Sequence, residues 1–343
     1  MDKEKAMTHL TMKKAASLLL LLSLCFSLCS CGDGSSGNSL PSVTPSNSSG
    51  GDVPDSLASN GDHSDASVPL SDGLRDNTSH VLAPSADGTE CYSCDVAVID
   101  ASNSSEGYIM VSYEGTNEKV KLQITGPDSV TYTYNLHGGY EAFPLTAGNG
   151  TYTISIFESV DIAANKYATT MSEMISANIT NEFGPYLYPN QYVNFTANSL
   201  PVAKAAELAK PANNDLDVVA SVYNYMIENY TYDYDKAATV QSGYLPDVDE
   251  IYQIQTGICF DYAAVTATML RSQSIPTRLE VGYKGEEYHA WISTYIKDIG
   301  WINGIIEFDG SAWHLLDPTF AATSSSPKKF IAEADGYITK YIY

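Results

Sequence analysis

Residues 257–263 read Gly-Ile-Cys-Phe-Asp-Tyr-Ala, and this stretch decides how the C-terminal part of the chain is interpreted. Apolar residues recur behind it at helical spacing, which predicts a helix from near Cys259 to about Gln273. Gly257 is a natural hinge just before the helix. Cys259 then lies in the first turn, where exposed N–H groups and the positive end of the helix dipole favour a thiolate, the nucleophilic form of cysteine. Taken alone, a cysteine in this position is more often a small buried apolar residue.

Two later stretches hold the residues that a cysteine nucleophile needs. Residues 287–292, Glu-Tyr-His-Ala-Trp-Ile, alternate as in a strand, with His289 and Trp291 on one face. Residues 313–319, Trp-His-Leu-Leu-Asp-Pro-Thr, predict a strand that ends in an acid, Asp317. A packed histidine and an Asp-Pro turn are each ordinary structural features. Their order after the cysteine is that of a Cys-His-Asp triad, in which the imidazole accepts the thiol proton and the carboxylate orients the ring.

The order of these motifs is that of a known enzyme family. Gly-x-Cys-x-Asp-Tyr-Ala, then Leu-Arg-Ser-Gln-Ser-Ile-Pro-Thr-Arg, then Tyr-His-Ala-Trp and Leu-Asp-Pro-Thr resemble the transglutaminase-like core of the papain-like superfamily, over roughly residues 215–320. The resemblance implies that Cys259 is the nucleophile, His289 the base and Asp317 the orienting acid.

The resemblance also implies an oxyanion hole, made by the backbone N–H of Cys259 and a side-chain donor upstream. Gln241, Tyr244 and Gln253 all precede the cysteine. Gln253 has the papain-like spacing, but Gln241 lies in a loop better suited to reach over the site, so Gln241 is the preferred candidate. An ordinary loop-surface role is the alternative for each of the three.

The segments around this core predict an α+β fold. Residues 91–198 contain short runs of alternating Thr, Tyr, Val and Ile between Gly-rich turns, which is typical of an all-β sandwich. The resemblance implies that residues 199–343 form the transglutaminase-like domain, with an amphipathic helix that starts near Asp215, then the cysteine helix, then antiparallel strands. The chain is therefore expected to have a papain-like core, with helices packed on an antiparallel sheet, preceded by the sandwich.

The N-terminal residues predict export and a lipid anchor. Lys13 and Lys14 precede a short apolar run, as in a secretory signal peptide over residues 1–30. The run ends Leu-Cys-Ser-Cys, which resembles the lipobox of bacterial lipoproteins and makes Cys31 the lipidated residue. Cleavage without a lipid and an uncleaved anchor are the alternatives. Residues 31–90 are rich in Gly, Ser, Asn and Asp and are expected to form a disordered tether, so the protein is predicted to be extracytoplasmic and held at the cell membrane.

The net charge and the positions of the cysteines limit the partners and cofactors that the protein is expected to bind. The net charge of −23 argues against a nucleic acid. Of the six cysteines, Cys25 and Cys29 lie in the predicted signal peptide, Cys31 directly follows it, and Cys91 and Cys94 form a C-x-x-C pair. In an exported chain a local disulfide is favoured for that pair over redox chemistry or a metal, and no second ligand pair fits a zinc site. No cofactor is expected.

The sequence thus predicts an exported, cell-surface cysteine acyl-transfer enzyme. Its thiol would form a thioester with a peptide or protein carboxamide, and water or an amine would resolve it, giving a peptidase, an amidase or a transglutaminase. The alternative is a catalytically idle transglutaminase-like module for surface binding or adhesion. In a third interpretation the sandwich binds the partner and the enzyme domain only trims or attaches it.

Overall fold

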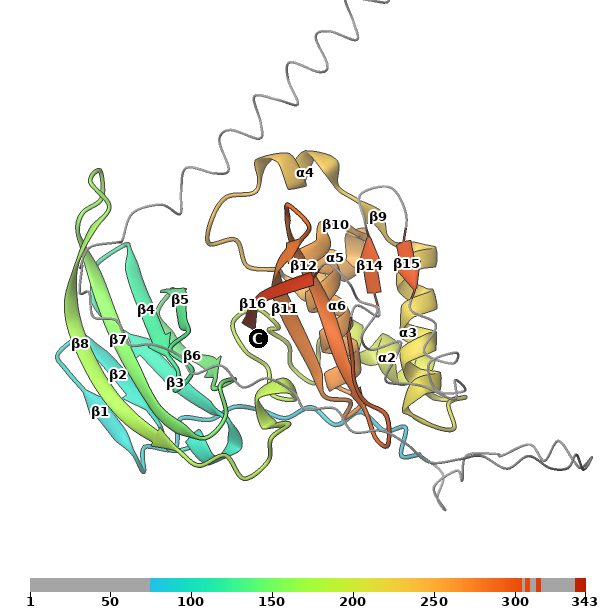
Figure 1. The fold of residues 1–343 in the computed structure, drawn as a ribbon, viewed down its shortest axis with the longest axis horizontal. Helices are drawn as coiled ribbons and strands as arrows, with labels where there is room; N and C mark the ends of the chain where they lie inside the picture. The colour runs from blue at the N-terminus through green and yellow to red at the C-terminus, as the bar shows by residue number, and fades with distance from the viewer. Residues whose placement is uncertain (1–74, 304–305, 309–312, 316–336) are drawn as a thin grey trace, which may run out of the picture. The chain divides into compact units, whose positions relative to one another are not determined.

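A computed structural model describes residues 75–303, 306–308, 313–315 and 337–343 (Figure 1). The predicted signal peptide, the predicted lipidation site Cys31 and most of the predicted tether lie outside these residues, as does Asp317. Among the described residues, no helix combines the length and the apolar character that crossing a bilayer requires.

The strand-rich part consists of two antiparallel four-stranded sheets, with strand orders β1-β2-β3-β6 and β5-β4-β7-β8. The strands are β1 (Cys91–Ser93), β2 (Ala97–Asp100), β3 (Tyr108–Tyr113), β4 (Val120–Thr125), β5 (Thr131–Leu136), β6 (Gly139–Pro144), β7 (Gly150–Asp161) and β8 (Lys166–Ala177), with short 3-10 helices η1 (Ser104–Glu106) and η2 (Gly184–Tyr186). In β4 the buried residues alternate with half-buried ones, as the sequence predicted. Buried residues of both sheets belong to one apolar core, so this region is an all-β sandwich.

The C-terminal part combines helices with a second set of strands. Its helices are α2 (Leu200–Ala209), α3 (Asp215–Asn229), α4 (Tyr234–Thr239), α5 (Val248–Ile254) and α6 (Cys259–Arg271). Its main sheet is antiparallel, in the order β13-β12-β11-β16, and is made of β11 (Thr277–Lys284), β12 (Glu287–Ile296), β13 (Gly300–Asn303) and β16 (Tyr337–Ile342). The predicted α+β class is confirmed.

Shorter strand pairs complete the described part of this region. β9 (Thr231–Tyr232) and β10 (Thr256–Gly257) pair in parallel, which brings Tyr232 opposite Gly257 just before α6. β14 (Ile306–Phe308) and β15 (Trp313–Leu315) pair antiparallel. α6 is buried along almost its whole length and packs on β11 and β12 on one side and on α2, α3 and α5 on others (Figure 1). The cysteine helix is therefore the central helix of this part.

Arg271 fixes the C-terminal end of α6. Its side chain is almost fully buried and donates to three backbone carbonyls, those of Thr277 at 2.9 Å, Tyr188 at 2.8 Å and Tyr343 at 2.8 Å. Three separate chain segments meet at this one guanidinium. The arginine of the Leu-Arg motif thus has a structural role.

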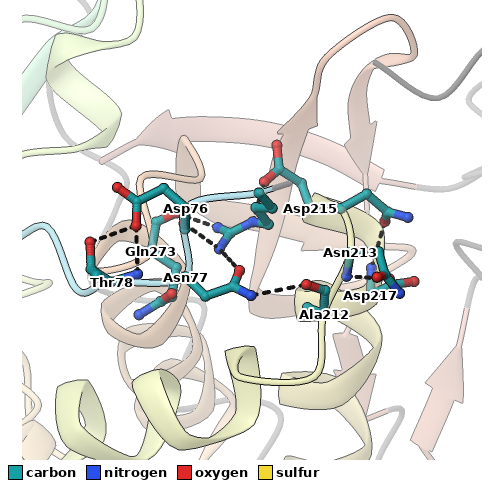
Figure 2. Close-up of polar contacts among 10 residues, drawn as sticks. Asp76, Asn77, Thr78, Ala212, Asn213, Asp215, Asp217 and Gln273 are labelled. Atoms are coloured by element: carbon teal, nitrogen blue, oxygen red, sulfur yellow. Dashed lines mark hydrogen bonds and ion pairs between the residues drawn. The ribbon is translucent and has the colours of Figure 1, made fainter. Parts of the chain in front are cut away.

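Residues Arg75–His80, here called the strap, are held against this region although the sequence assigned them to the tether. Arg75 bonds to Asp215 at 2.7 Å and to the Gln273 carbonyl at 2.6 Å, and Asn77 donates to the Ala212 carbonyl (Figure 2). The backbone N–H of His80 donates to the Ser272 carbonyl at 2.7 Å. The strap therefore joins the start of α3 to the end of α6. Helix α3 begins at Asp215, where the sequence predicted it, and Asn214 caps it by accepting from the Asp217 N–H at 2.9 Å.

The expected disulfide between Cys91 and Cys94 is not formed in the structure. Both cysteines are free and exposed. Cys91 is the first residue of β1, and Cys94 follows its last residue, with the Cys94 N–H donating to the Ala97 carbonyl at 2.9 Å.

Candidate active site

The start of α6 is built by local contacts around Cys259. Ile258 is extended, and its backbone N–H donates to the Asp261 carboxylate at 2.9 Å, which fixes the first turn. A Cβ on Gly257 would lie 2.7 Å from that carboxylate, so only glycine fits here without displacing it. Cys259 is the first residue of the helix, in the turn where the sequence predicted it.

The Cys259 thiol is half-buried and lies against strand β12. Burial raises the pKa of the thiol, and the backbone amides of Ala290 and Phe260 oppose the rise. The amide of Ala290 belongs to the peptide bond that joins it to His289. The structure thus brings the sulfur atom to the backbone of the predicted base. The direction of the pKa shift is opposite to the one expected from the helix dipole, because burial outweighs the helix terminus.

His289 lies near the start of β12, where it pairs with Gly282 on β11. Its side chain is buried, and its ring is nearly parallel to that of Trp291, with 6.3 Å between ring centroids and 19° between planes. Both rings project from the same face of the strand, as the alternation predicted. This buried imidazole belongs to the residue directly before the amide that faces the Cys259 sulfur, and an imidazole is the side chain that most often accepts a proton in catalysis.

The other predicted site residues are not brought to the thiol by any described contact. Asp317 lies outside the described residues, so its role stays a prediction. Gln241 is exposed, and its amide donates to the Thr239 carbonyl at 2.7 Å. Gln253 is also exposed. Tyr244 is engaged with Asp261 at 2.6 Å. The oxyanion-hole donor therefore also stays a prediction.

Two tyrosines that the sequence analysis did not single out flank the thiol. Tyr232, on β9, faces the backbone amide of Cys259; burial raises its pKa, the Cys259 thiol adds to the rise, and the amide opposes it. Tyr288, on β12, is about half exposed; partial burial raises its pKa to about 12, and Tyr341, Tyr283 and, to a smaller extent, the Cys259 thiol add to the rise. Adjacency to His289 could have indicated Tyr288, but the β9–β10 pairing that places Tyr232 leaves no local trace in the sequence.

A second omission is a charged cluster beneath the same helix terminus. The Asp261 side chain is fully buried and bonds to Lys236 Nζ at 2.6 Å. Lys236 belongs to α4, a short helix that the sequence analysis did not predict. Asp261 was visible in the Gly-x-Cys-x-Asp motif, whereas its partner lies 25 residues earlier.

Comparison with known proteins agrees with the order of the motifs. A family model described as the transglutaminase-like superfamily matches residues 202–304. This part of the chain is therefore a transglutaminase-like domain, as its motifs predicted, and that family supports a function of the cysteine-enzyme type. The match ends before Asp317. None of the curated proteins compared with this chain matches it.

Solved structures give only partial likenesses. A candidate cysteine protease from Cytophaga hutchinsonii is 14% identical, with a TM-score of 0.31, and the match covers 62% of this chain and 67% of that one. A candidate protease from Parabacteroides distasonis is 13% identical, with a TM-score of 0.27 and coverages of 53% and 37%. Red sea bream transglutaminase is 14% identical, with a TM-score of 0.30 and coverages of 67% and 54%. The chain thus spans about half or less of the last two structures, and the family match alone carries the assignment.

Proposed function

We propose that this protein is an exported, lipid-anchored cysteine acyl-transfer enzyme that acts on carboxamides of peptides or proteins. The observation that carries the proposal is the position of Cys259, in the first turn of a buried helix with its sulfur against the peptide that joins His289 to Ala290. The transglutaminase-like match over residues 202–304 supports the same chemistry.

The proposed reaction has two steps. Because burial raises the pKa of the thiol, the resting form is the thiol, and His289 takes its proton as Sγ attacks the carboxamide carbon. The C–N bond then breaks, the amine or ammonia leaves with that proton, and a thioester remains on Cys259. Water or an amine attacks the thioester, His289 accepts the proton of the attacking group, and the sulfur leaves and is reprotonated.

Asp317 is proposed to orient the His289 ring and to stabilise its charged form. Gln241 is proposed to join the Cys259 N–H in stabilising the oxyanion. The Gln241 amide donates one N–H to the Thr239 carbonyl at 2.7 Å, so its second N–H, or a turn of the side chain, would have to supply this bond. Loss of an oxyanion donor lowers kcat about 10²-fold or more, so Gln241→Ala should show a loss of this size. Gln253→Ala is the matched control and should change kcat little.

A direct test is mass spectrometry of the full chain after incubation with glutamine-containing peptides and a primary amine. The wild type is expected to carry an acyl adduct on Cys259 and to release a deamidated, cleaved or amine-coupled peptide. Cys259→Ala should give neither product, and His289→Ala should lose most of the turnover. Wild-type protein that forms no adduct and no product with any peptide would refute the enzymatic proposal.

The idle binding module is the second candidate, and one observation favours it. Burial raises the pKa of the thiol, so a smaller fraction of it is ionised near neutral pH than in a free cysteine. Iodoacetamide labelling separates the two candidates. In an enzyme, Cys259 reacts faster than in His289→Ala, whereas equal and slow labelling of both proteins supports the binding module.

A further inference from the structure

Asp261 forms an unusual contact set two residues after the proposed nucleophile. One carboxylate oxygen accepts from the Ile258 N–H at 2.9 Å and from Lys236 Nζ at 2.6 Å. The other accepts from the Tyr244 hydroxyl at 2.6 Å. Lys236 Nζ also donates to that hydroxyl at 2.7 Å and lies 4.3 Å from the centre of the Tyr244 ring. These three side chains are called the Asp261 clamp.

Capping of the helix explains only one of these contacts. An acid in the first turn can accept a backbone N–H and stabilise the helix while it stays in water. Here the Asp261 side chain has no exposed surface, and a buried carboxylate is costly unless it is paired. A buried carboxylate with a lysine and a phenol as dedicated partners is more than a cap requires.

The clamp is held rigidly from the other side as well. The backbone N–H of Asp233 donates to the Gly257 carbonyl at 2.9 Å, and the Asp233 side chain caps α4 by accepting from the Lys236 N–H at 2.8 Å. The residues before Lys236 and those before Cys259 therefore run side by side. The Lys236 backbone is therefore held beside the turn that holds the cysteine, within reach of Asp261.

We infer that Asp261 is a positioning residue for reaction at Cys259, that it acts through the Ile258–Cys259 backbone, and that Lys236 is its obligatory counter-charge. The inference rests on the proposed function, since it assigns a task to residues that do not touch the reacting atoms. The clamp keeps the thiol at the tip of α6 and cancels the negative charge that Asp261 would otherwise place beside it.

The electrostatic part of the inference involves charged and titratable groups that, within the described residues, lie on the elements around the start of α6. These are Asp261 on α6, Lys236 on α4, Tyr244 in the loop after α4, Tyr232 on β9, and Tyr288 and His289 on β12. Asp261 contributes to the raised pKa of the thiol. Removal of Lys236 alone should therefore raise this pKa further, and neutralisation of Asp261 alone should lower it.

The experiment measures the rate of iodoacetamide labelling of Cys259 against pH, in the full chain with its other cysteines replaced by serine. We expect the midpoint to rise by about one pH unit in Lys236→Met and to fall by about as much in Asp261→Asn, for charges a few ångströms apart in a partly buried site. The double variant removes both charges and should return the midpoint to the wild-type value. Lys204→Met is the matched control, because Lys204 is paired with Glu207 on the surface of α2.

The outcomes separate positioning from simple structural support. Opposite shifts in the two single variants, rescue in the double variant and no shift in the control support the inference. A midpoint that stays at the wild-type value in both single variants overturns it, and so does a shift of the same sign in both. If Asp261→Asn does not fold, the inference is tested by comparing Lys236→Met with Tyr244→Phe. Only Lys236→Met removes a charge, so only this variant should move the midpoint. Labelling needs no turnover, so a failure of acyl transfer in the wild type refutes the proposed function and leaves this test intact.

Discussion

Replacement of Arg271 by methionine should destabilise the protein strongly, although the residue lies at the far end of α6 from the thiol. The change removes three hydrogen bonds to buried or half-buried backbone carbonyls. A buried acceptor left without a partner costs about 1–3 kcal/mol. The Tyr343 carbonyl also accepts from the Leu279 N–H at 2.9 Å, so it keeps one partner. The carbonyls of Thr277 and Tyr188 lose this donor, and the bond to Tyr343 is lost as well, so we expect the free energy of unfolding to fall by about 3–5 kcal/mol.

Urea denaturation, followed by circular dichroism, measures this loss. Arg271→Lys should fall between the wild type and Arg271→Met, because a single ammonium cannot reach three carbonyls with the fixed fork of a guanidinium. Lys204→Met is again the control, since an exposed ion pair contributes at most about 1 kcal/mol. A loss below about 1 kcal/mol in Arg271→Met would show that the three segments are held together by other contacts and would refute this reasoning.

Three further predictions concern the site and the strap. Burial raises the pKa of Cys259 in the folded state. The thiol therefore contributes stability that is fully present below the pKa of the unfolded thiol, about 8.5, and that is lost as the pH rises through the raised folded value. The urea midpoints of the wild type and Cys259→Ala should converge as the pH increases above about 8.5. Gly257→Ala places a Cβ 2.7 Å from the Asp261 carboxylate, so it should lower Tm by several degrees and slow the labelling of Cys259. Gly285→Ala is the control: its left-handed backbone is unsuited to alanine, but no neighbouring atom lies within 4 Å of the added Cβ, so the labelling rate should stay unchanged. Arg75→Met should expose the strap to limited proteolysis ahead of His80 without altering labelling at Cys259; an unchanged cleavage pattern contradicts the idea that Arg75 fastens it.

The parts of the fold that were predictable from sequence are those with a local pattern. The start of α6 follows from a glycine, a run of apolar residues and an acid in the first turn, all within a few positions. β12 follows from simple alternation, and so does the placement of His289 and Trp291 on one face. Local periodicity therefore fixed the position of the predicted nucleophile and base along their elements.

What the sequence could not predict depends on partners that are distant along the chain. β16 completes the main sheet by pairing with β11, and neither strand carries a sign of the other. The strap is polar and resembles a tether in composition, yet its bonds go to carbonyls of the loops near Ala212 and Ser272. The Asp261 clamp likewise depends on the three-dimensional path of α4, which the sequence analysis did not recognise as a helix.

The pairing of β16 with β11 also affects the order of events during synthesis. Tyr343 exchanges both of its backbone hydrogen bonds with Leu279, and a Cβ on Gly282 would lie 2.0 Å from the Ile338 carbonyl, so the two strands approach as closely as glycine allows. A nascent chain that has emerged only as far as β13 still exposes the β11 edge of the main sheet to solvent or to other chains. The sheet that packs against the cysteine helix would therefore be complete only after residues 337–343 had been synthesised. Until then, the unpaired edge of β11 would be available for incorrect strand pairing.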